Sequence, residues 1–291
     1  MRKLLLLAAL SLAMFSCATT AIVSGQVQEC SVWSYNIRYL NDADSLNGNG
    51  WSSRLPWICS LVNWGAPDIL GCQEVTWTQL ENMADNLPQY AWIGEGRDGG
   101  KEGEASPLFY RTDRLTLEES GTFWLSETPE TVSRGWDAAL NRVCTWGHFR
   151  YINSGASVWV FNLHNDHFGK KAPLESAKLV LEKIAGLCKD GDSVVVTGDF
   201  NQDQDSEMYR LYTSSLSDAY SSAQVRYSPD GTFNKFGAMV PNPKRIDHIF
   251  VSPFVKVLSY GVLTETYRDS SGAIRYPSDH YPVTVRIVLT Q

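Results

Sequence analysis

Short apolar runs rich in β-branched and aromatic residues recur along the whole chain, and this pattern predicts strands. The final run is the clearest, because Val283, Val285, Ile287 and Leu289 alternate with more polar positions. Polar or Gly-rich stretches separate the runs. The predicted strands are residues 31–37, 68–73, 107–110, 115–117, 142–150, 157–163, 193–197, 246–251 and 282–289.

Fewer segments show a helical pattern. Residues 51–64 look helical, and residues 172–187 predict an amphipathic helix. A third helix is predicted at 78–87, where Thr78 and Glu81 fit a capping box. Helices are spaced through the chain and do not alternate strictly with strands. A core of two sheets flanked by helices therefore fits better than a doubly wound parallel sheet.

The first 24 residues read as an export signal. Arg2 and Lys3 precede an apolar stretch, residues 4–13, that is too short to span a bilayer. Cys17 lies where a lipoprotein peptidase would leave a lipidated cysteine, so lipid anchoring and simple secretion both stay open. The predicted location is the periplasm, an anchored position on the outer membrane, or the extracellular space, with membrane contact only through that anchor.

Residues 25–291 show no Pro/Ser-rich linker, no repeat and no second export or membrane segment, which favours one domain and a monomer. Residues 94–104 are rich in Gly and charge, and predict a mobile loop at the rim of a site. Apart from Cys17, the cysteines are widely spaced and form no CxxC pair, which favours buried small hydrophobes over a disulfide framework or a zinc cage. They are Cys30, Cys59, Cys72, Cys144 and Cys188.

A formal charge of −7 argues against broad electrostatic capture of duplex nucleic acid. It does not exclude a nuclease, because a bound divalent cation inverts the local field at an acidic site. The chain has ten tryptophans. Most are expected in the core or at strand edges, while those in loops are able to stack on a base or a sugar ring.

Polar side chains follow several predicted strands at the point where each ends. Asp199 and Asn201 follow the strand at 193–197, and Asn36 and Glu74 end the first two strands. Taken singly, each is more often a turn residue or a solvated strand end than a catalytic group. Taken together, Asn36 and Glu74 make a plausible site for Mg²⁺, which prefers oxygen ligands and keeps part of its water shell.

Two histidines, His164 and His167, lie just past the strand at 157–163. Lone histidines are usually bystanders, and zinc lacks support because no HExxH or cysteine partner is present. A cationic or donor His164 touching a phosphate oxygen is the better interpretation.

Asp247 lies inside an apolar strand, and a buried carboxylate requires a partner. Asp279-His280, immediately before the last strand, supplies one. Such a pair fixes the imidazole tautomer and holds its other nitrogen towards a substrate. The alternative is a structural salt link.

These motifs together resemble the endonuclease/exonuclease/phosphatase superfamily over about residues 31–291. Residues 120–126 and 135–137 look like an exported bacterial branch of it, similar to the deadenylase-like exonucleases. Leu163 stands where these proteins commonly have Thr, and His248 where Tyr is usual. The motifs in order are Ser-Tyr-Asn36-Ile-Arg, Gln-Glu74-Val, Asn-Leu-His164, Gly-Asp199-Phe-Asn201, Arg-Ile-Asp247 and Ser-Asp279-His280.

The resemblance implies a four-layered αββα sandwich of two packed mixed sheets. It implies that Glu74 binds the metal, helped by Asn36 and Asp279, and that Asp199 orients or deprotonates the attacking water. It also implies that three side chains contact the phosphate. Arg142, Tyr110 and His167 are weaker candidates for a phosphate clamp. The three implied contacts are His164, Asn201 and His280, the last held by Asp247.

The predicted function is divalent-metal-dependent hydrolysis of a phosphodiester, or less often a monoester, by direct attack of water. The substrate stays open between RNA or DNA and a small or lipid-derived phosphoester, and Mn²⁺ or Ca²⁺ stays open beside Mg²⁺. No GxSxG or GxxxxGK[ST] motif is present, so serine hydrolase and nucleotide-driven chemistry lack support. The alternative is a non-catalytic envelope binding protein that holds a glycan or lipid headgroup on the same scaffold.

Overall fold

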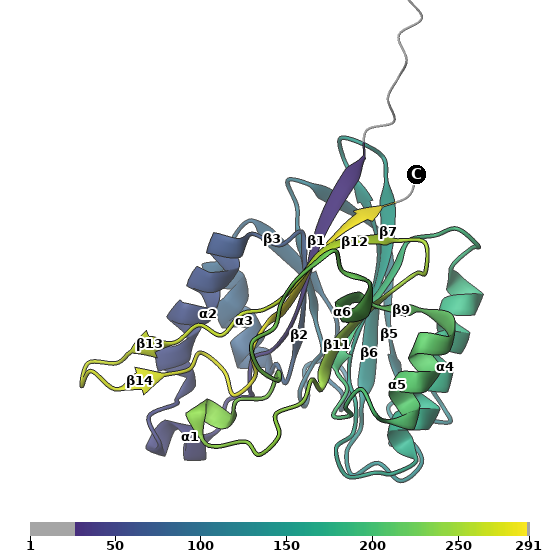
Figure 1. The fold of residues 1–291 in the computed structure, drawn as a ribbon. Coiled ribbons are helices and arrows are strands. Elements are labelled where there is room, and N and C mark those ends of the chain that lie inside the picture. Colours follow the sequence, from purple (N-terminus) through teal and green to yellow (C-terminus); the bar gives the residue numbers. More distant parts are fainter. Residues whose placement is uncertain (1–26, 290–291) are drawn as a thin grey trace, which may run out of the picture.

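A computed structural model of the protein describes residues 27–289. The predicted signal at 1–24 and Cys17 lie outside the described residues. Within the described part, two β-sheets pack face to face and helices cover their outer faces (Figure 1). This is the predicted α/β sandwich with an αββα order of layers. Among residues 27–289, no helix is long and apolar enough to cross a membrane.

The first sheet has seven strands and contains both the first and the last strand of the chain. The parallel pair at its centre is β1 and β2, and β15 runs antiparallel to β1 on the other side. In spatial order the strands are β10 (Val225–Tyr227), β12 (Lys256–Val262), β15 (Val283–Leu289), β1 (Gln28–Asn36), β2 (Ile69–Gln73), β4 (Leu108–Arg111) and β3 (Tyr90–Ile93).

The second sheet has six strands, with the parallel pair β7 and β8 at its centre. In spatial order the strands are β5 (Leu115–Trp124), β6 (Val143–Tyr151), β7 (Ser157–His164), β8 (Val194–Asp199), β11 (Asp247–Val251) and β9 (Ser217–Asp218). A separate hairpin, β13 (Tyr267–Arg268) with β14 (Ile274–Arg275), lies beside α2 (Figure 1).

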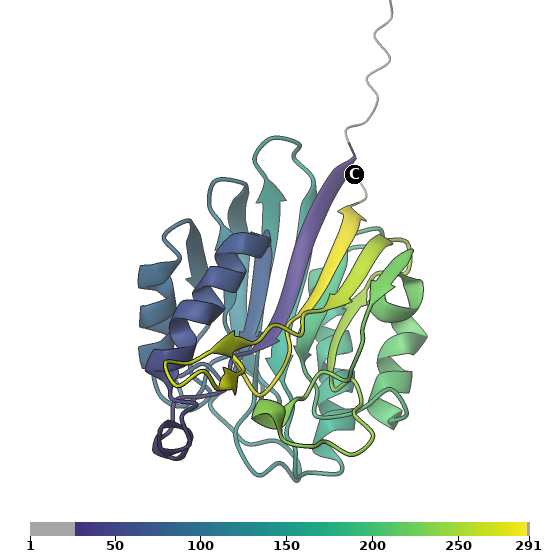
Figure 2. The ribbon, with the colours of Figure 1, turned by 60° about the vertical axis from the view of Figure 1, so that its left-hand side comes forward.

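Helices cover each sheet on the side away from the other sheet. Figure 2 shows α2 (Trp51–Gly65) crossing the outer face of the first sheet, with α3 (Trp77–Asn86) on the same side. The second sheet is covered by α4 (Ala172–Leu187) and α5 (Glu207–Ser215). The short elements α1 (Asp42–Leu46), α6 (Ala219–Ser222) and a 3₁₀ turn at Lys235–Gly237 lie in connections.

Three apolar layers result, one between the sheets and one under each set of helices. Along β1, Val32 faces the layer between the sheets while Trp33 and Tyr35 face α2. Along β7, Val160 faces the layer between the sheets while Phe161 faces α4 and α5. Strands buried on both faces read as continuous apolar runs, which explains the sequence pattern.

A polar link crosses the layer between the sheets directly below the predicted site. Asn162 of β7 accepts hydrogen bonds from Gln73 Nε2 at 2.7 Å and Thr197 Oγ1 at 3.0 Å, and it donates to the Cys72 carbonyl at 2.7 Å. Gly71 leaves room for this link, because a Cβ there would lie 2.6 Å from Asn162 Oδ1. The link therefore fixes how the two sheets lie relative to each other.

Most predicted elements are confirmed, and the differences have local causes. The helix predicted at 78–87 is α3. Its N-terminal cap is Thr76, whose capping box is completed by Gln79, so the prediction that Thr78 and Glu81 form the box is wrong. β5 runs on to Trp124, well beyond the predicted 115–117. The five cysteines in the described part are free, and all but Cys188 are buried, as predicted.

Candidate active site

The ends of strands from both sheets meet at one end of the sandwich and enclose a cavity of about 540 Å³. Because β1 is parallel to β2 and β7 to β8, the side chains that end these strands converge there. Most predicted site residues line it, and they are Glu74, Arg142, His164, His167, Asp199, Asn201, Asp279 and His280. The sequence analysis missed six more, and they are Arg38, Tyr39, Arg97, Glu104, Leu140 and Phe233.

Asp199 lies at the centre of the site and is held on both carboxylate oxygens. Its Oδ2 accepts a hydrogen bond of 2.9 Å from Asn36 Nδ2, and its Oδ1 accepts one of 2.9 Å from the Asn201 backbone N–H. Asn36 is fully buried, and it also donates to Glu74 Oε1 at 3.0 Å. Asn36 therefore orients one carboxylate from each sheet, while its predicted role as a metal ligand stays a prediction.

Burial raises the pKa of Asp199 to about 7, and the nearby carboxylate of Asp247 adds to the rise. His280 and the two hydrogen-bond donors act in the opposite direction. A carboxylate with a pKa near neutral is a better proton acceptor than an ordinary aspartate, whose pKa is far lower. The position thus suits a general base.

Asp247 and His280 form the pair that the sequence predicts. Asp247 Oδ2 lies 2.9 Å from His280 Nδ1, and His280 Nε2 lies 3.7 Å from Asp199 Oδ2. Burial alone would lower the pKa of His280, but Asp247 and Asp199 outweigh it and hold that pKa well above its usual value. His280 therefore favours its protonated form more strongly than an ordinary histidine does, and it faces the cavity with Asp247 behind it.

His164 and Asn201 form a second polar pair on the other side of Asp199. Asn201 Nδ2 lies 3.0 Å from both His164 Nε2 and the Asn165 carbonyl oxygen, which fixes the amide with its N–H groups towards both. Burial and the nearby cations Arg142 and His280 lower the pKa of His164 well below its usual value. Of the two predicted forms of His164, cationic or neutral donor, this favours the neutral one.

Arg142 and His167 lie deeper on the same wall. Arg142 is 4% exposed, its Nη2 lies 3.0 Å from His167 Nδ1, and its Nε has no hydrogen-bond partner in the described part of the chain. The nearest carboxylate oxygen to that Nε is Asp166 Oδ1 at 3.5 Å. A buried guanidinium with an unused donor beside a cavity is suited to binding an anion.

Oxygen ligands for a cation gather around Glu74. Glu74, His164 and Asp199 each offer an atom to a group whose members lie within 4.8 Å of one another. Carboxylate oxygens dominate this set, which fits a hard divalent cation such as Mg²⁺, Mn²⁺ or Ca²⁺. The donor set thus agrees with the predicted metal site at Glu74, and Asp279 lines the same cavity.

Three residues of the cavity hold left-handed backbone conformations that residues other than glycine rarely adopt. The φ angles are 59° at Arg38, 60° at Glu74 and 51° at Asn201. Such strain persists only where surrounding contacts impose it, and it gathers at functional sites. No feature of the sequence indicates it, since an Asn or Glu after a strand is common in ordinary turns.

Arg54 of α2 supports the site from below and was missed by sequence analysis. It is fully buried and donates to the backbone carbonyls of Ile37 at 2.6 Å, Arg38 at 3.0 Å and Pro277 at 3.0 Å. These bonds join the segment after Asn36 to the segment before Asp279. A lone arginine in an apolar helix was the available signal.

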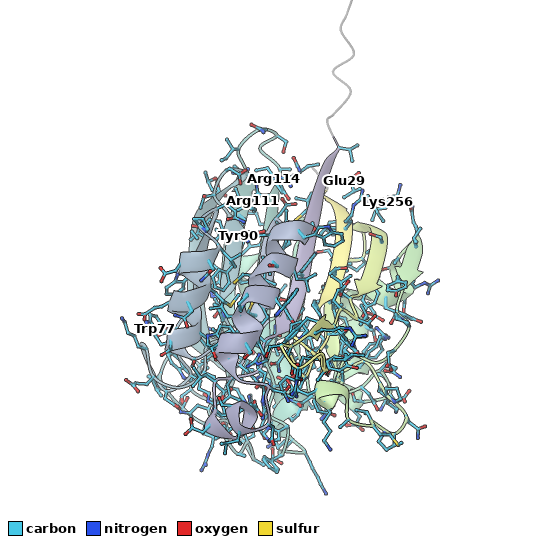
Figure 3. The ribbon with its side chains drawn as sticks, turned by 90° about the vertical axis from the view of Figure 1, so that its left-hand side faces the viewer. Glu29, Trp77, Tyr90, Arg111, Arg114 and Lys256 are labelled. Carbon is cyan, nitrogen blue, oxygen red and sulfur yellow. The ribbon has the colours of Figure 1, made fainter. Side chains whose placement is uncertain are left out.

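The structure does not bring Tyr110 to the cavity. Its ring packs on Phe149 with centroids 5.1 Å apart, so it belongs to the packing between the sheets. The nearby Arg111 and Arg114 lie, like Glu29, towards the end of the sandwich where β1 begins, opposite to its last residue Asn36 (Figure 3). Basic residues at that end are therefore too far away to serve the site.

Known proteins share this fold and much of this sequence. A Bacteroides thetaiotaomicron mannosyl-6-phosphatase is 48% identical with a TM-score of 0.87, over 89% of this chain and 99% of that one. An endonuclease/exonuclease/phosphatase family protein of the same organism is 47% identical with a TM-score of 0.88, over 91% and 99% of the two chains. The human Nocturnin catalytic domain, at 20% identity and a TM-score of 0.70 over 91% and 97%, shows the same fold.

A curated relative, uncharacterized protein L388 of Acanthamoeba polyphaga mimivirus, is 25% identical over 81% of this chain and 91% of its own length. The family model for endonucleases, exonucleases and phosphatases matches residues 33–280. That match runs from β1 to His280, so it includes every strand end that lines the cavity. The chain belongs to the endonuclease/exonuclease/phosphatase family and is a hydrolase of phosphoester bonds.

Proposed function

We propose that the protein is a divalent-metal-dependent phosphomonoesterase that removes phosphate from a phosphorylated sugar. The observation that carries this proposal is 48% identity to a mannosyl-6-phosphatase over nearly all of that chain. The sequence alone favours phosphodiesters as substrates, whereas the identity to a mannosyl-6-phosphatase favours phosphomonoesters. The likeness to human Nocturnin at 20% identity and to D. rerio TDP2 at 19% supports only the shared fold.

The charges around the cavity support a monoester, which carries up to two negative charges. Arg38, Arg97, Arg142 and His280 line the cavity together with the carboxylates of Glu74, Glu104, Asp199 and Asp279, so the cavity offers donors for phosphate oxygens beside acidic groups for a cation. Arg97 is paired with Glu104 at 2.9 Å, whereas Arg142 lies 3.5 Å from Asp166 Oδ1 through an Nε that has no hydrogen-bond partner in the described part of the chain. Arg142 is accordingly the arginine best able to bind a non-bridging oxygen.

The residues divide the chemistry among them. Asp199 accepts a proton from the attacking water, because its raised pKa makes it an effective base and Asn36 and Asn201 hold it in place. His280 donates to a phosphate oxygen as negative charge develops on it, and Asn201 and neutral His164 turn to the phosphate only by giving up the hydrogen bond between them. A bond forms between the water oxygen and phosphorus, the bond from phosphorus to the sugar oxygen breaks, and that oxygen takes up a proton from solvent while Asp199 returns its own to solvent.

Glu74 would hold the cation, with Asp279 and Asn36 completing its surroundings directly or through water. When bound, the cation supplies neutralisation of phosphate charge. This assignment has a readout besides activity. Binding of Mn²⁺ or Mg²⁺ is expected to raise the melting temperature, because a cation that binds only the folded state stabilises it, and Glu74→Gln is expected to weaken that effect.

The test is hydrolysis by the protein without residues 1–24, followed as released phosphate for the monoesters, as p-nitrophenol for the synthetic diester and as shortened fragments for RNA. The substrates are mannose 6-phosphate, p-nitrophenyl phosphate, bis-p-nitrophenyl phosphate and single-stranded RNA, each with Mg²⁺ and with EDTA. Metal-dependent release of phosphate from mannose 6-phosphate, faster than cleavage of either diester, is the expected result.

The test variant is Asp199→Asn, which removes the proposed base and should abolish the release. Its matched control is Asp190→Asn, the same substitution at an exposed aspartate outside the cavity. Preference for RNA or the synthetic diester would overturn the monoester proposal and return the weight to a diesterase. Silence with every substrate, from a folded protein, would favour the binding-protein alternative. The extracytoplasmic location predicted from residues 1–24 belongs to the proposal, and fractionation of cells tests it.

A further inference from the structure

A second hollow adjoins the catalytic cavity. It has a volume of about 370 Å³ and shares Asn201 and Phe233 with that cavity as lining residues, so the two lie side by side. Its remaining wall comes from the residues after β8 and from the segment 228–246 that precedes β11. We call it the adjoining hollow, and it is lined besides by Gln202, Asp203, Val240, Asn242, Lys244 and Ile246.

The side chains of the adjoining hollow offer hydrogen bonds of both kinds beside an apolar surface. Gln202 and Asn242 each carry a carboxamide, which both donates and accepts. Within residues 27–289, neither carboxamide has a hydrogen-bond partner. Phe233 presents a half-buried ring at the boundary with the catalytic cavity. A few placed polar groups on an apolar wall are the usual lining of a small-molecule site.

Lys244, the cation that lines the adjoining hollow, is paired with carboxylates, whereas Arg142 in the catalytic cavity keeps a donor unused within residues 27–289. Lys244 Nζ lies 2.6 Å from both Asp203 Oδ2 and Asp205 Oδ2, and these bonds raise its pKa to about 12. The ammonium group of Lys244 is thus charged at neutral pH and forms ion pairs with two carboxylates. A phosphate backbone would find no free cation there, whereas a neutral ligand rich in hydroxyl groups meets donors and acceptors.

The wall of the adjoining hollow is tied to the catalytic elements. His248 Nε2 lies 2.9 Å from the Gln202 carbonyl oxygen, which fixes the chain beside Asn201. Thr232 accepts hydrogen bonds of 3.0 Å from both Ile246 and Asp247, and Phe233 pairs with the His280 backbone. A ligand in the hollow is therefore held by the same segments that carry Asp247 and His280.

We infer that the adjoining hollow is the subsite for the neutral sugar released by the reaction, with Gln202 and Asn242 binding its hydroxyl groups and Phe233 packing against its ring. This inference rests on the proposed function, because it takes a sugar phosphate as the substrate. It adds the residues that distinguish a sugar phosphate from any other monoester. The phosphate itself stays in the catalytic cavity.

The experiment compares two monoesters, mannose 6-phosphate and p-nitrophenyl phosphate, with the wild type and a Gln202→Ala/Asn242→Ala variant. Loss of two hydrogen bonds to the sugar is expected to lower kcat/KM for mannose 6-phosphate about tenfold more than for p-nitrophenyl phosphate. The control is Met239→Ala, whose side chain lies in the same segment, is 87% exposed and is outside the lining of either space. It should leave the ratio of the two substrates unchanged.

An unchanged ratio in the double variant, with a wild-type melting temperature, would overturn the subsite and leave the proposed function intact. A wild type that cleaves p-nitrophenyl phosphate but no sugar phosphate would overturn both. A fall in RNA cleavage in the double variant would instead assign the hollow to a nucleic acid. A larger loss for mannose 6-phosphate supports the inference.

Discussion

The catalytic cavity and the adjoining hollow share two residues but are built in different ways. The groups of the cavity stand at strand ends, and Asn36, Asp199 and Asp247 are almost completely buried. The hollow is lined largely from a loop, where Asn242 and Lys244 are exposed. Strand ends fix atoms to within the precision that chemistry needs, while loops accept changes in sequence with little effect on the fold.

The difference teaches that reaction and selectivity are separable in this molecule. A change among the buried groups should remove turnover with every substrate. A change in the loop should redistribute turnover among substrates. The following variants break or sharpen that distinction.

The largest effect is expected from Asp199→Asn. The amide keeps the shape of the side chain but cannot accept a proton from water, so kcat should fall about 1,000-fold with every monoester. Asp190→Asn is the control, and phosphate release is the measurement. A fall confined to one substrate would show that Asp199 contributes to selectivity and would contradict its role as base.

The second variant, Asp247→Asn, removes the charge that holds His280 as a cation. The wild type keeps this cation through neutral pH because its pKa is well above the usual value. In the variant the pKa of His280 is lower, so His280 loses its proton at a lower pH than in the wild type. We expect a loss of about 100-fold in kcat, with activity declining at a lower pH than in the wild type. The pH–rate profile measures this, and identical profiles would exclude the pairing as its cause.

Arg142→Gln sharpens the comparison from within the cavity. Removing a charge-assisted bond to a phosphate oxygen should raise KM for monoesters about tenfold, and competitive inhibition by inorganic phosphate should weaken in parallel. Exposed Arg134→Gln, outside the cavity lining, serves as the control. An equal rise in KM for monoester and diester substrates would show that Arg142 does not cause a preference for monoesters.

The smallest effect concerns His248, which joins the two regions through Gln202. Burial lowers the pKa of His248 to about 4. Below pH 6.5, His248 binds a proton in the unfolded chain but stays neutral in the folded chain. The free energy of unfolding therefore falls as pH drops from 6.5 towards 4. His248→Gln cannot be protonated and still donates to the Gln202 carbonyl. Its loss of unfolding free energy between pH 7 and pH 5 should be smaller than that of the wild type by roughly 2 kcal/mol.

Chemical denaturation at the two pH values measures this difference. It concerns the slope with pH, so a general destabilisation by the substitution does not affect it. An equal slope in both proteins would show that His248 does not dominate acid sensitivity.

The sequence predicts the buried, strand-built part of the molecule better than the rest. Two-sided burial makes strands such as β7 and β8 continuous apolar runs, so both their positions and the polar residues that end them are legible. The strands β3, β12 and the helix α5 were not predicted, since they lie at edges or mix polar and apolar residues. The misplaced cap at α3 arose because Thr76 and Thr78 both offer a cap in sequence.

The candidate site was predictable for the same reason and to the same extent. Glu74, His164 and Asp199 end strands, and the structure brings them within 4.8 Å. Arg97 lies in the Gly-rich segment predicted as the rim, yet nothing local indicates that its side chain enters the cavity. Phe233 and Asn242 come from a loop whose path depends on contacts distant in sequence, such as that of Thr232 with Asp247.

The polar link of Gln73, Asn162 and Thr197 has a consequence for partly folded forms of the chain. Glu74 belongs to one sheet and Asp199 to the other, and the link is what sets them opposite each other. In a compact state that keeps its strands and helices but loses side-chain packing, the two sheets slide independently. Such a state would retain its far-ultraviolet circular dichroism while losing all catalysis. Enzyme activity in this protein therefore reports the docking of the two sheets as well as the formation of each one.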